Sequence, residues 1–342
     1  MSKDKSQETI PYSILELATV GKGVSVSDTF KNSLKLAQAA EDLGYKRFWL
    51  AEHHNMVSIA SSATSVLISH IAGGTKSIRV GSGGIMLPNH SSLIIAEQFS
   101  TLAHLYPDRI DLGLGRAPGT DQTTAQAIRP DRMQAVYQFP QELEQIQKYF
   151  SKENVNAKVR VPIAEGINLP TYILGSSTDS AHLAAKLGLP YVFASHFAPT
   201  HLFEAFEIYR REFKPSKFLK EPKTIACINA IVADTNEEAE RISTSMIRML
   251  IGVLTGRLDY MQPPTAMTPD LKAVVENPAL QRMMAYAFAG DKAMVSEKTK
   301  QFLEDTQADE LMVVSHIYDY EDRLKSVTLF AELMKDLNAV PA

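Results

Sequence analysis

The sequence predicts an α/β protein, a (β/α)8 TIM barrel, and three observations lead to this fold. Eight short runs rich in Val, Ile and Leu alternate along the 342 residues with eight segments of helical period. Strands buried on both faces have such near-continuous apolar sequences, and parallel pairing needs a crossover helix between strands. Polar or glycine-rich residues follow several of the runs, where a parallel barrel builds its active site. Eight strand–helix units favour closure into a barrel over an open sheet.

The apolar runs place the strands at residues 12–19, 47–53, 78–86, 109–117, 170–176, 191–196, 224–232 and 310–316. The amphipathic segments place the helices at residues 29–43, 60–72, 92–105, 131–150, 179–187, 200–213, 236–254 and 320–337. The first helix is expected to begin at an Asp28 N-cap and to end at Gly44, and Pro107 stops the third. No linker of low complexity interrupts this order, so residues 1–342 are expected to form one domain, with residues 1–9 as a disordered tail.

Two segments exceed what a simple barrel needs. Residues 151–169 form an insertion without a clear period before the fifth strand. Residues 255–290 form a long loop before the eighth strand and contain four prolines and four methionines. Long loops inside a compact domain are usually functional or disordered. The second segment is interpreted as a lid over the barrel mouth, with a plain surface insertion as the alternative.

The composition excludes several classes of function. The net charge of −4 comes from 35 basic and 39 acidic residues without a basic stripe, so neither nucleic acid nor an anionic membrane is an expected partner. Cys227 is the only cysteine, which excludes intrachain disulfides and thiolate metal clusters and suits a reducing compartment. Residues 1–9 lack the apolar core of a secretory signal, and no apolar run is long enough to cross a membrane. A cytoplasmic protein is expected.

Glu52-His53-His54 ends the second expected strand and is the first candidate for catalysis. The HExxH spacing of a zinc protease helix is missing, and so is the His-x-His of metal-dependent hydrolases. Adjacent residues of a strand point to opposite sides, so only one of the two imidazoles can face the barrel axis. A buried structural histidine is the ordinary alternative, but the position at the carboxyl end of a strand favours function.

Gly83 and Gly84 stand in the middle of the third expected strand, where glycine costs stability and packs nothing. One interpretation is a backbone that a flat ligand approaches closely. The other is a β-bulge, which needs no ligand.

Arg116 and three serines are candidates for binding a phosphate. The glycines around Arg116 do not fit G-x-G-x-x-G, so a Rossmann site is not expected, but a guanidinium at a strand end can clamp a phosphate. Ser176, Ser177 and Ser180 lead into a helix, where hydroxyls and free amides make an anion site. A surface salt bridge and simple helix capping are the alternatives. Ser195-His196 and Ser315-His316 close the sixth and eighth strands as candidates for a substrate cavity, with no chemical step assigned.

The chain resembles the bacterial luciferase-like flavin monooxygenases over nearly its whole length. The resemblance rests on Ala-Glu-His-His, Val-Gly-Ser-Gly-Gly-Ile-Met-Leu-Pro-Asn-His and Arg-Ile-Asp-Leu-Gly-Leu-Gly-Arg-Ala-Pro-Gly-Thr-Asp, which are specific in combination. It implies a (β/α)8 barrel that binds FMN at its C-terminal mouth, with residues 255–290 as a mobile loop over the site. It also implies a role for each of a set of residues: His53 beside the reactive flavin edge, Glu52 among the cofactor-binding residues, a cis peptide at Gly83-Gly84 under the flavin ring, and Arg116, Ser176, Ser177 and Ser180 at the FMN phosphate.

Two positions depart from luciferase. Luciferase has a glutamate at the position of Ser176, which leaves a backbone contact there, and a reactive cysteine at the position of Gly115. Light emission is therefore not inferred. The resemblance implies oxidation of a small organic substrate by O2, reduced FMN supplied by a transient NAD(P)H:flavin reductase, and a homodimer.

Three alternatives remain open at this point. Relatives on the same barrel use the deazaflavin coenzyme F420, so an F420-dependent oxidoreductase is the nearest rival. A non-catalytic flavin-binding protein is a second. A metal-dependent barrel hydrolase is a third, disfavoured because no His/Asp cluster has the spacing of metal ligands.

Overall fold

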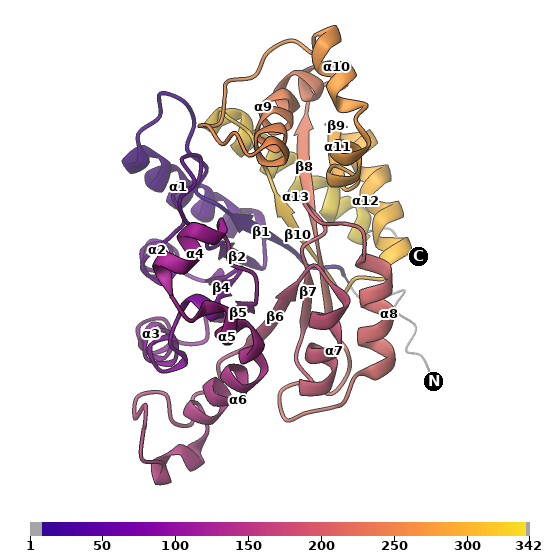
Figure 1. The fold of residues 1–342 in the computed structure, drawn as a ribbon. Helices are drawn as coiled ribbons and strands as arrows, with labels where there is room; N and C mark the ends of the chain where they lie inside the picture. The colour runs from indigo at the N-terminus through magenta and orange to yellow at the C-terminus, as the bar shows by residue number, and fades with distance from the viewer. Residues whose placement is uncertain (1–8, 340–342) are drawn as a thin grey trace.

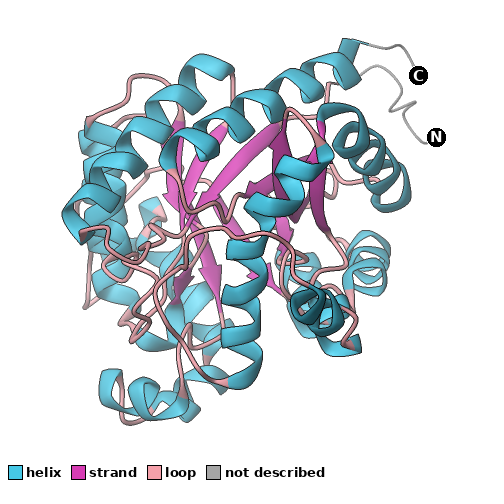
Figure 2. Ribbon diagram, turned by 90° about the horizontal axis from the view of Figure 1, so that it is seen from above, coloured by secondary structure: helices cyan, strands magenta, loops and turns pink. Residues whose placement is uncertain are grey.

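A computed structural model of the chain describes residues 9–339, and its central feature is a closed parallel β-barrel (Figures 1 and 2). Strand β10 pairs with both β1 and β8, which closes the ring, and every pairing between barrel strands is parallel. The strands that form the ring are, in chain order, β1 (Tyr12–Glu16), β2 (Arg47–Leu50), β3 (Arg79–Ser82) continued by β4 (Ile85–Met86), β5 (Ile110–Gly115), β6 (Thr171–Gly175), β7 (Tyr191–Phe193), β8 (Thr224–Ala233) and β10 (Glu310–Val314). The predicted TIM-barrel fold is confirmed.

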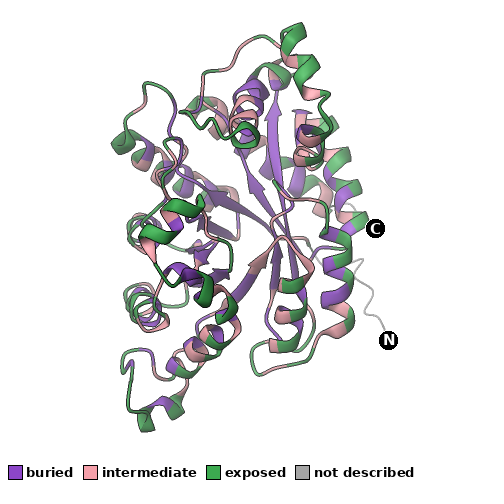
Figure 3. Cartoon of the chain, in the orientation of Figure 1, coloured by how far each residue is buried: buried purple, intermediate pink, exposed green. Residues whose placement is uncertain are grey.

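Helices surround the barrel on its outside (Figure 2). Their inner faces and the strands are buried, and their outer faces are exposed (Figure 3). The helices of this layer are α1 (Val26–Leu43), α2 (Thr64–Gly73), α3 (Ser92–Leu105), α6 (Phe139–Tyr149), α7 (Thr178–Leu187), α8 (Leu202–Glu212), α9 (Asn236–Thr255), α12 (Lys292–Thr306) and α13 (Tyr320–Ala339). The first of them shows one correction: Ser25 is its N-cap and accepts a hydrogen bond from the Asp28 amide at 3.0 Å, whereas Gly44 ends it in the left-handed conformation as predicted.

The strand side chains divide into two apolar sets because successive residues point to opposite faces. One set packs against the helices and includes Phe48, Leu112 and Ile228. The other set fills the interior of the barrel, and its members are Leu15, Leu17, Trp49, Ala51, Ile59, Tyr172, Val192, Ile225, Cys227, Met312 and Val314. The barrel is therefore a packed core, and a site can only lie at one of its ends.

Buried charged side chains close the N-terminal end of the barrel. The Arg47 guanidinium donates to Glu310 at 2.6 and 3.0 Å and to Asp111 at 2.6 Å. Asp111 also accepts from Arg79 and from the Trp49 indole, at 2.6–3.0 Å. Every charge in this network has an opposite charge and further hydrogen bonds, so the N-terminal end is closed by a paired cluster.

The connection between β5 and β6 differs from the single helix predicted over residues 131–150. It contains three short helices, α4 (Gln122–Ile128), α5 (Arg132–Tyr137) and α6. The break falls at Gln138, directly before Phe139 and Pro140, because proline is favoured in the first turn of a helix and has no amide for a helix interior. The insertion at residues 151–169 has one short 3-10 helix (Lys152–Asn156), and its Val161 and Ala164 are buried against α3 and α6.

The prediction of an irregular loop over residues 255–290 is wrong for its second half. Two helices, α10 (Pro269–Val275) and α11 (Pro278–Met283), pack with α9 in a separate apolar cluster. Strand β9 (Ala287–Asp291) then pairs with the upper half of β8, from Asn229 to Ala233. Helix α12 follows directly, and no helix was predicted there. The composition of β9, three small residues in five, hid it from sequence reasoning.

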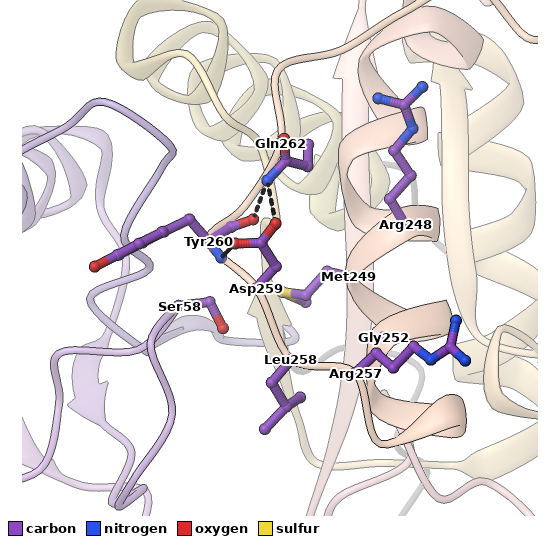
Figure 4. A pocket seen from close by; sticks show the side chains of 9 residues that line it. All are labelled: Ser58, Arg248, Met249, Gly252, Arg257, Leu258, Asp259, Tyr260 and Gln262. Atoms are coloured by element: carbon purple, nitrogen blue, oxygen red, sulfur yellow. Dashed lines mark hydrogen bonds between the residues drawn. The ribbon is translucent and has the colours of Figure 1, made fainter.

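The first half of the same segment crosses toward the β1–α1 connection and is attached there. Met261 is buried, its amide donates to the Val20 carbonyl at 3.0 Å, and its carbonyl accepts from the Lys22 amide at 2.8 Å. A small pocket remains between this segment and Ser58 of the β2–α2 connection (Figure 4). Asp259 accepts from the Gln262 side chain at 3.0 Å inside the same segment. Residues 257–262 are therefore an anchored strap and not a free loop.

Candidate active site

The C-terminal end of the barrel collects most of the residues singled out from the sequence. Alternation along each strand continues past its last residue, so His53 follows Trp49 and Ala51 on the inward side of β2. In the same way His316 follows Met312 and Val314 of β10. His53 and Arg116 lie on the same rim, because the loop that begins at Arg116 contacts the residues after β2 through Gly119.

His53 carries a neutral imidazole held at one nitrogen. Its Nδ1 lies 3.2 Å from the Gly119 carbonyl, which fixes the ring and leaves Nε2 without a partner in the described chain. Burial lowers the pKa of His53, and the hydrogen bond that its ring donates to the Gly119 carbonyl and the nearby Glu52 carboxylate only partly offset this effect. Because the Gly119 carbonyl only accepts, Nδ1 carries the proton of the neutral ring, and Nε2 can accept a proton at neutral pH. Its neighbour His54 turns away from the axis and hydrogen-bonds Glu52 at 2.9 Å, as the alternation predicts.

Glu52, which the resemblance places among the cofactor-binding residues, has a carboxylate that is engaged by the protein. Its buried carboxylate accepts from the rings of His54 and His90 at 2.9 Å, from the Met86 amide at 2.9 Å and from the Asn89 amide at 3.2 Å. Burial alone raises the pKa of Glu52, but these hydrogen bonds outweigh it and lower the pKa to about 2. The carboxylate thus ties the β4–α3 connection to the end of β2.

The peptide bond between Gly83 and Gly84 is cis, as the resemblance implies. The strand also bulges there, because Gly81 pairs with Asp111 and Ile85 pairs with Leu114, which leaves one extra residue on the β3–β4 side. A Cβ on Gly83 would lie 2.5 Å from Leu15, inside the barrel. The strand register therefore confirms the β-bulge, whereas the close approach of a flat ligand to this backbone stays a prediction.

Arg116 lies at the N-terminus of α7, where the candidate serines also are. Its guanidinium contacts the Asp179 carboxylate of the first turn at 3.0 Å, and both groups are exposed, so the pair is weak. Ser177 occupies the N-cap position of α7, but its side chain makes no capping hydrogen bond. The Ser180 hydroxyl donates to the Ser177 carbonyl at 2.7 Å. The Ser177 hydroxyl therefore does not cap the helix, and its expected contact with a phosphate stays a prediction.

Asn229, His196 and His316 add polar groups to the wall opposite the glycine pair, and sequence reasoning missed Asn229. It is a polar residue inside the apolar run of β8, which was the available signal. Its side-chain amide donates to the His196 carbonyl at 2.6 Å. Burial, together with the neighbouring His53, lowers the pKa of His196 to about 3. Burial is the main cause that lowers the pKa of His316 to about 3, and smaller contributions come from His196, Arg323 and His53.

The described residues contain no group of three or more His, Cys, Asp or Glu side chains arranged to hold a metal ion. They also contain no helix long and apolar enough to cross a membrane. What the mouth offers is a neutral imidazole, bare backbone and an open helix N-terminus beside a guanidinium. This set can bind a flat, anionic-tailed molecule and exchange a proton with it.

Comparison with known proteins gives consistent results over the whole chain. The family model described as luciferase-like monooxygenase matches residues 10–314. The Bacillus subtilis (strain 168) protein YvbT is 46% identical over 337 residues, 98% of this chain and 100% of its own. A luciferase-like monooxygenase of Escherichia coli (strain K12) is 45% identical over 332 residues, 97% of this chain and 99% of its own.

Solved structures agree with this result. The crystal structure of apo-MsnO8 matches with a TM-score of 0.86 at 33% identity, over 97% of this chain and 100% of that one. An oxygenating constituent of 3,6-diketocamphane monooxygenase in complex with FMN matches with a TM-score of 0.72 at 17% identity, over 95% of this chain and 97% of that one. An F420-dependent secondary alcohol dehydrogenase matches with a TM-score of 0.68 at 14% identity, over 95% of this chain and 98% of that one. At such low identities the last two show a shared fold alone.

Proposed function

Because this chain belongs to the luciferase-like monooxygenase family and is a flavin-dependent oxidoreductase, we propose that it uses reduced FMN and O2 to oxidise a small organic substrate. The reduced FMN comes from a separate NAD(P)H:flavin reductase, since the sequence has no dinucleotide fingerprint of its own. Bound reduced flavin would supply the two electrons of the reaction, in which one oxygen atom of O2 enters the substrate and the other leaves as water.

One observation carries the choice of a phosphate-bearing flavin: Arg116 lies beside an uncapped helix N-terminus. Helix α7 begins with free amides and an unused Ser177 hydroxyl, and Arg116 contacts the first turn. A phosphate would replace the weak contact with Asp179 by charge-assisted hydrogen bonds. In this proposal Ser176 contributes its backbone, Ser177 contributes its hydroxyl, and the Ser180 hydroxyl turns from the Ser177 carbonyl to the phosphate.

The flavin ring would lie against the cis peptide at Gly83-Gly84, where no side chain intervenes. His53 would then face the reacting edge with its Nε2, oriented through Nδ1 by Gly119. Glu52 is proposed to act as a positioning residue, because its carboxylate holds Met86 and His90 and is not free for the cofactor. The proposed chemistry requires that water be excluded from the reacting centre.

A comparison of FMN with riboflavin tests the phosphate site directly. Arg116→Ala should weaken FMN binding about 10- to 100-fold, the range expected for lost hydrogen bonds to a charged group, and should leave riboflavin affinity within about twofold. Fluorescence titration measures both dissociation constants. Arg160→Ala is the matched control, because Arg160 is also exposed and paired with a carboxylate, Glu165, but lies far along the chain in the insertion. Equal losses for FMN and riboflavin would contradict the proposal.

Two further titrations separate the rival functions. Coenzyme F420 should bind more weakly than FMN, and tighter binding of F420 would assign the chain to the deazaflavin branch. His53→Ala should leave FMN affinity within about threefold but change the rate at which O2 oxidises the bound reduced FMN by at least about 10-fold. A non-catalytic flavin carrier would show no change in that rate, so stopped-flow absorbance distinguishes the two.

A homodimer through α2 and α3 is also proposed. These helices expose large apolar side chains, with Val66 66% exposed, Leu105 59% and Ile94 45%. Such side chains gathered on adjacent helices are typical of an interaction surface. Light scattering should give a dimer for the wild-type chain and a monomer for Val66→Glu. A monomeric wild-type chain would reject the interface.

A further inference from the structure

Three buried polar side chains on one wall of the barrel mouth have atoms without protein partners. Asn229 is 1% exposed, His316 5% and His196 9%. The Asn229 Oδ1 and the Nδ1 atoms of both histidines find no hydrogen-bond partner in residues 9–339. A buried polar group left unpaired destabilises the folded chain, so three on one wall indicate a ligand.

The three side chains come from neighbouring parts of the barrel mouth. Asn229 lies on β8, and its side-chain amide donates at 2.6 Å to the carbonyl of His196, which lies in the turn after β7. Asn229 pairs with Val314 of β10, and His316 follows two residues later on the same inward side. Strand β8 is four places from β3 in the ring of eight, which puts this wall across the mouth from Gly83-Gly84.

The wall carries hydrogen-bonding capacity but no net charge. Burial keeps both imidazoles neutral at neutral pH. Arg323 influences His316 and is bound by the Glu16 carboxylate through both terminal nitrogens, so its charge is already balanced, although its buried Nε has no partner in the described residues. An anionic group placed here would be buried without a counter-charge, which is strongly unfavourable.

The atoms define what such a group must offer. The Asn229 amide nitrogen is used by the His196 carbonyl, so its free Oδ1 is an acceptor and needs a donor. Each neutral imidazole offers one donor and one acceptor. We propose that His196, Asn229 and His316 form the substrate-recognition subsite, and that they bind an uncharged group that both donates and accepts hydrogen bonds, such as a primary amide or a hydroxyl.

This subsite rests on the proposed flavin function for its place beside the reaction, but its test does not require flavin. Hexanamide, methyl hexanoate and hexanoate share an acyl chain and differ in the head group: the amide donates and accepts, the ester only accepts, and the carboxylate is charged. At pH 7.5, calorimetry on the chain without flavin should give affinities in that order, with hexanamide at least about 10-fold tighter than hexanoate. Nitrogen-15 spectra of the histidine rings should show shifts at His196 and His316 and none at the exposed His201.

Two variants locate the interaction. Asn229→Leu should remove the preference for hexanamide over methyl hexanoate, and His316→Phe should weaken hexanamide about 10-fold while FMN affinity stays within twofold. His201→Gln is the control for removing an imidazole and should change neither value. Three results would overturn the proposal: hexanoate binds as tightly as hexanamide, the wild-type chain binds amide and ester equally, or the signals of the His196 and His316 rings do not shift. Unshifted rings would mean that only ordered water contacts these nitrogen atoms. Loss of FMN binding with intact hexanamide binding would reject the flavin proposal and retain this one.

Discussion

The two ends of the barrel both bury polar side chains, but only one end leaves them unpaired. At the N-terminal end, Arg47 is held between Glu310 and Asp111 at 2.6 Å each. At the C-terminal end, His196 and His316 have ring nitrogens without protein partners. The same strands connect the two ends, so the difference in hydrogen-bond pairing indicates different roles for the two ends. The paired charges at the N-terminal end favour one folded arrangement. The unpaired atoms at the C-terminal end remain free to form hydrogen bonds with a ligand.

Removing Arg47 should give the largest effect on stability. Arg47→Met leaves Glu310 and Asp111 as buried carboxylates that have lost a partner, and breaking a buried pair in this way costs about 3–5 kcal/mol in the free energy of unfolding. Urea unfolding measures the loss. Lys292→Met removes an exposed lysine that contacts Glu332 and should cost less than about 1 kcal/mol. Equal losses for the two variants would show that the N-terminal network is not a stabilising feature.

Acidification should act first on the other end. The folded-state pKa values of His196 and His316, about 3, lie below the ordinary value of 6.5, so between these values the unfolded chain binds more protons than the folded chain. Stability therefore falls as pH falls, by about 2 kcal/mol for each histidine between pH 7 and pH 5. Glu310, whose pKa is lowered by Arg47 despite its burial, loses its contribution only below its ordinary value of 4.5.

Replacing both histidines by phenylalanine should remove most of this slope between pH 7 and pH 5. Urea unfolding at a series of pH values measures it. An unchanged slope would mean that other groups bind the protons and that the two imidazoles are not held neutral by burial.

A single replacement at the mouth should have the smallest effect, and in the opposite direction. His316→Phe at pH 7 removes an unpartnered buried ring nitrogen and keeps a similar shape, so the free energy of unfolding should rise by about 1 kcal/mol. A fall of the same size would show that the His316 ring is satisfied in the folded chain and that the contrast between the two ends is weaker than described.

The barrel itself could be predicted because its strands bury both faces. Each ring strand coincides with a predicted apolar run. Most of the observed strands end one to three residues before the predicted ends, and β8 ends one residue after its predicted end, at Ala233. Strand β9 and helix α12 could not be predicted in this way, because β9 lies outside the closed ring and consists largely of small residues. The prediction of a single helix over residues 131–150 was wrong at Pro140. Whether a proline lies in the first turn of a helix depends on the residues around it.

The candidate site was predictable in part for a related reason. His53, Arg116 and the glycine pair stand at the ends of apolar runs, and position in the chain reveals them. The buried network of Arg47, Asp111 and Glu310 was not recognised, because charged residues at strand starts look like exposed boundaries. Which imidazoles lack partners depends on contacts between distant strands, and no local pattern encodes it.

The central claim is that the C-terminal mouth, between the glycine pair and the histidine wall, is a flavin site. A crystal structure of the chain grown with FMN tests it most directly. We expect the phosphate within hydrogen-bond distance of the Arg116 guanidinium and the first amides of α7, and the ring against Gly83-Gly84. Density for FMN at any other place, or a mouth that stays without flavin at saturating FMN, would contradict the account.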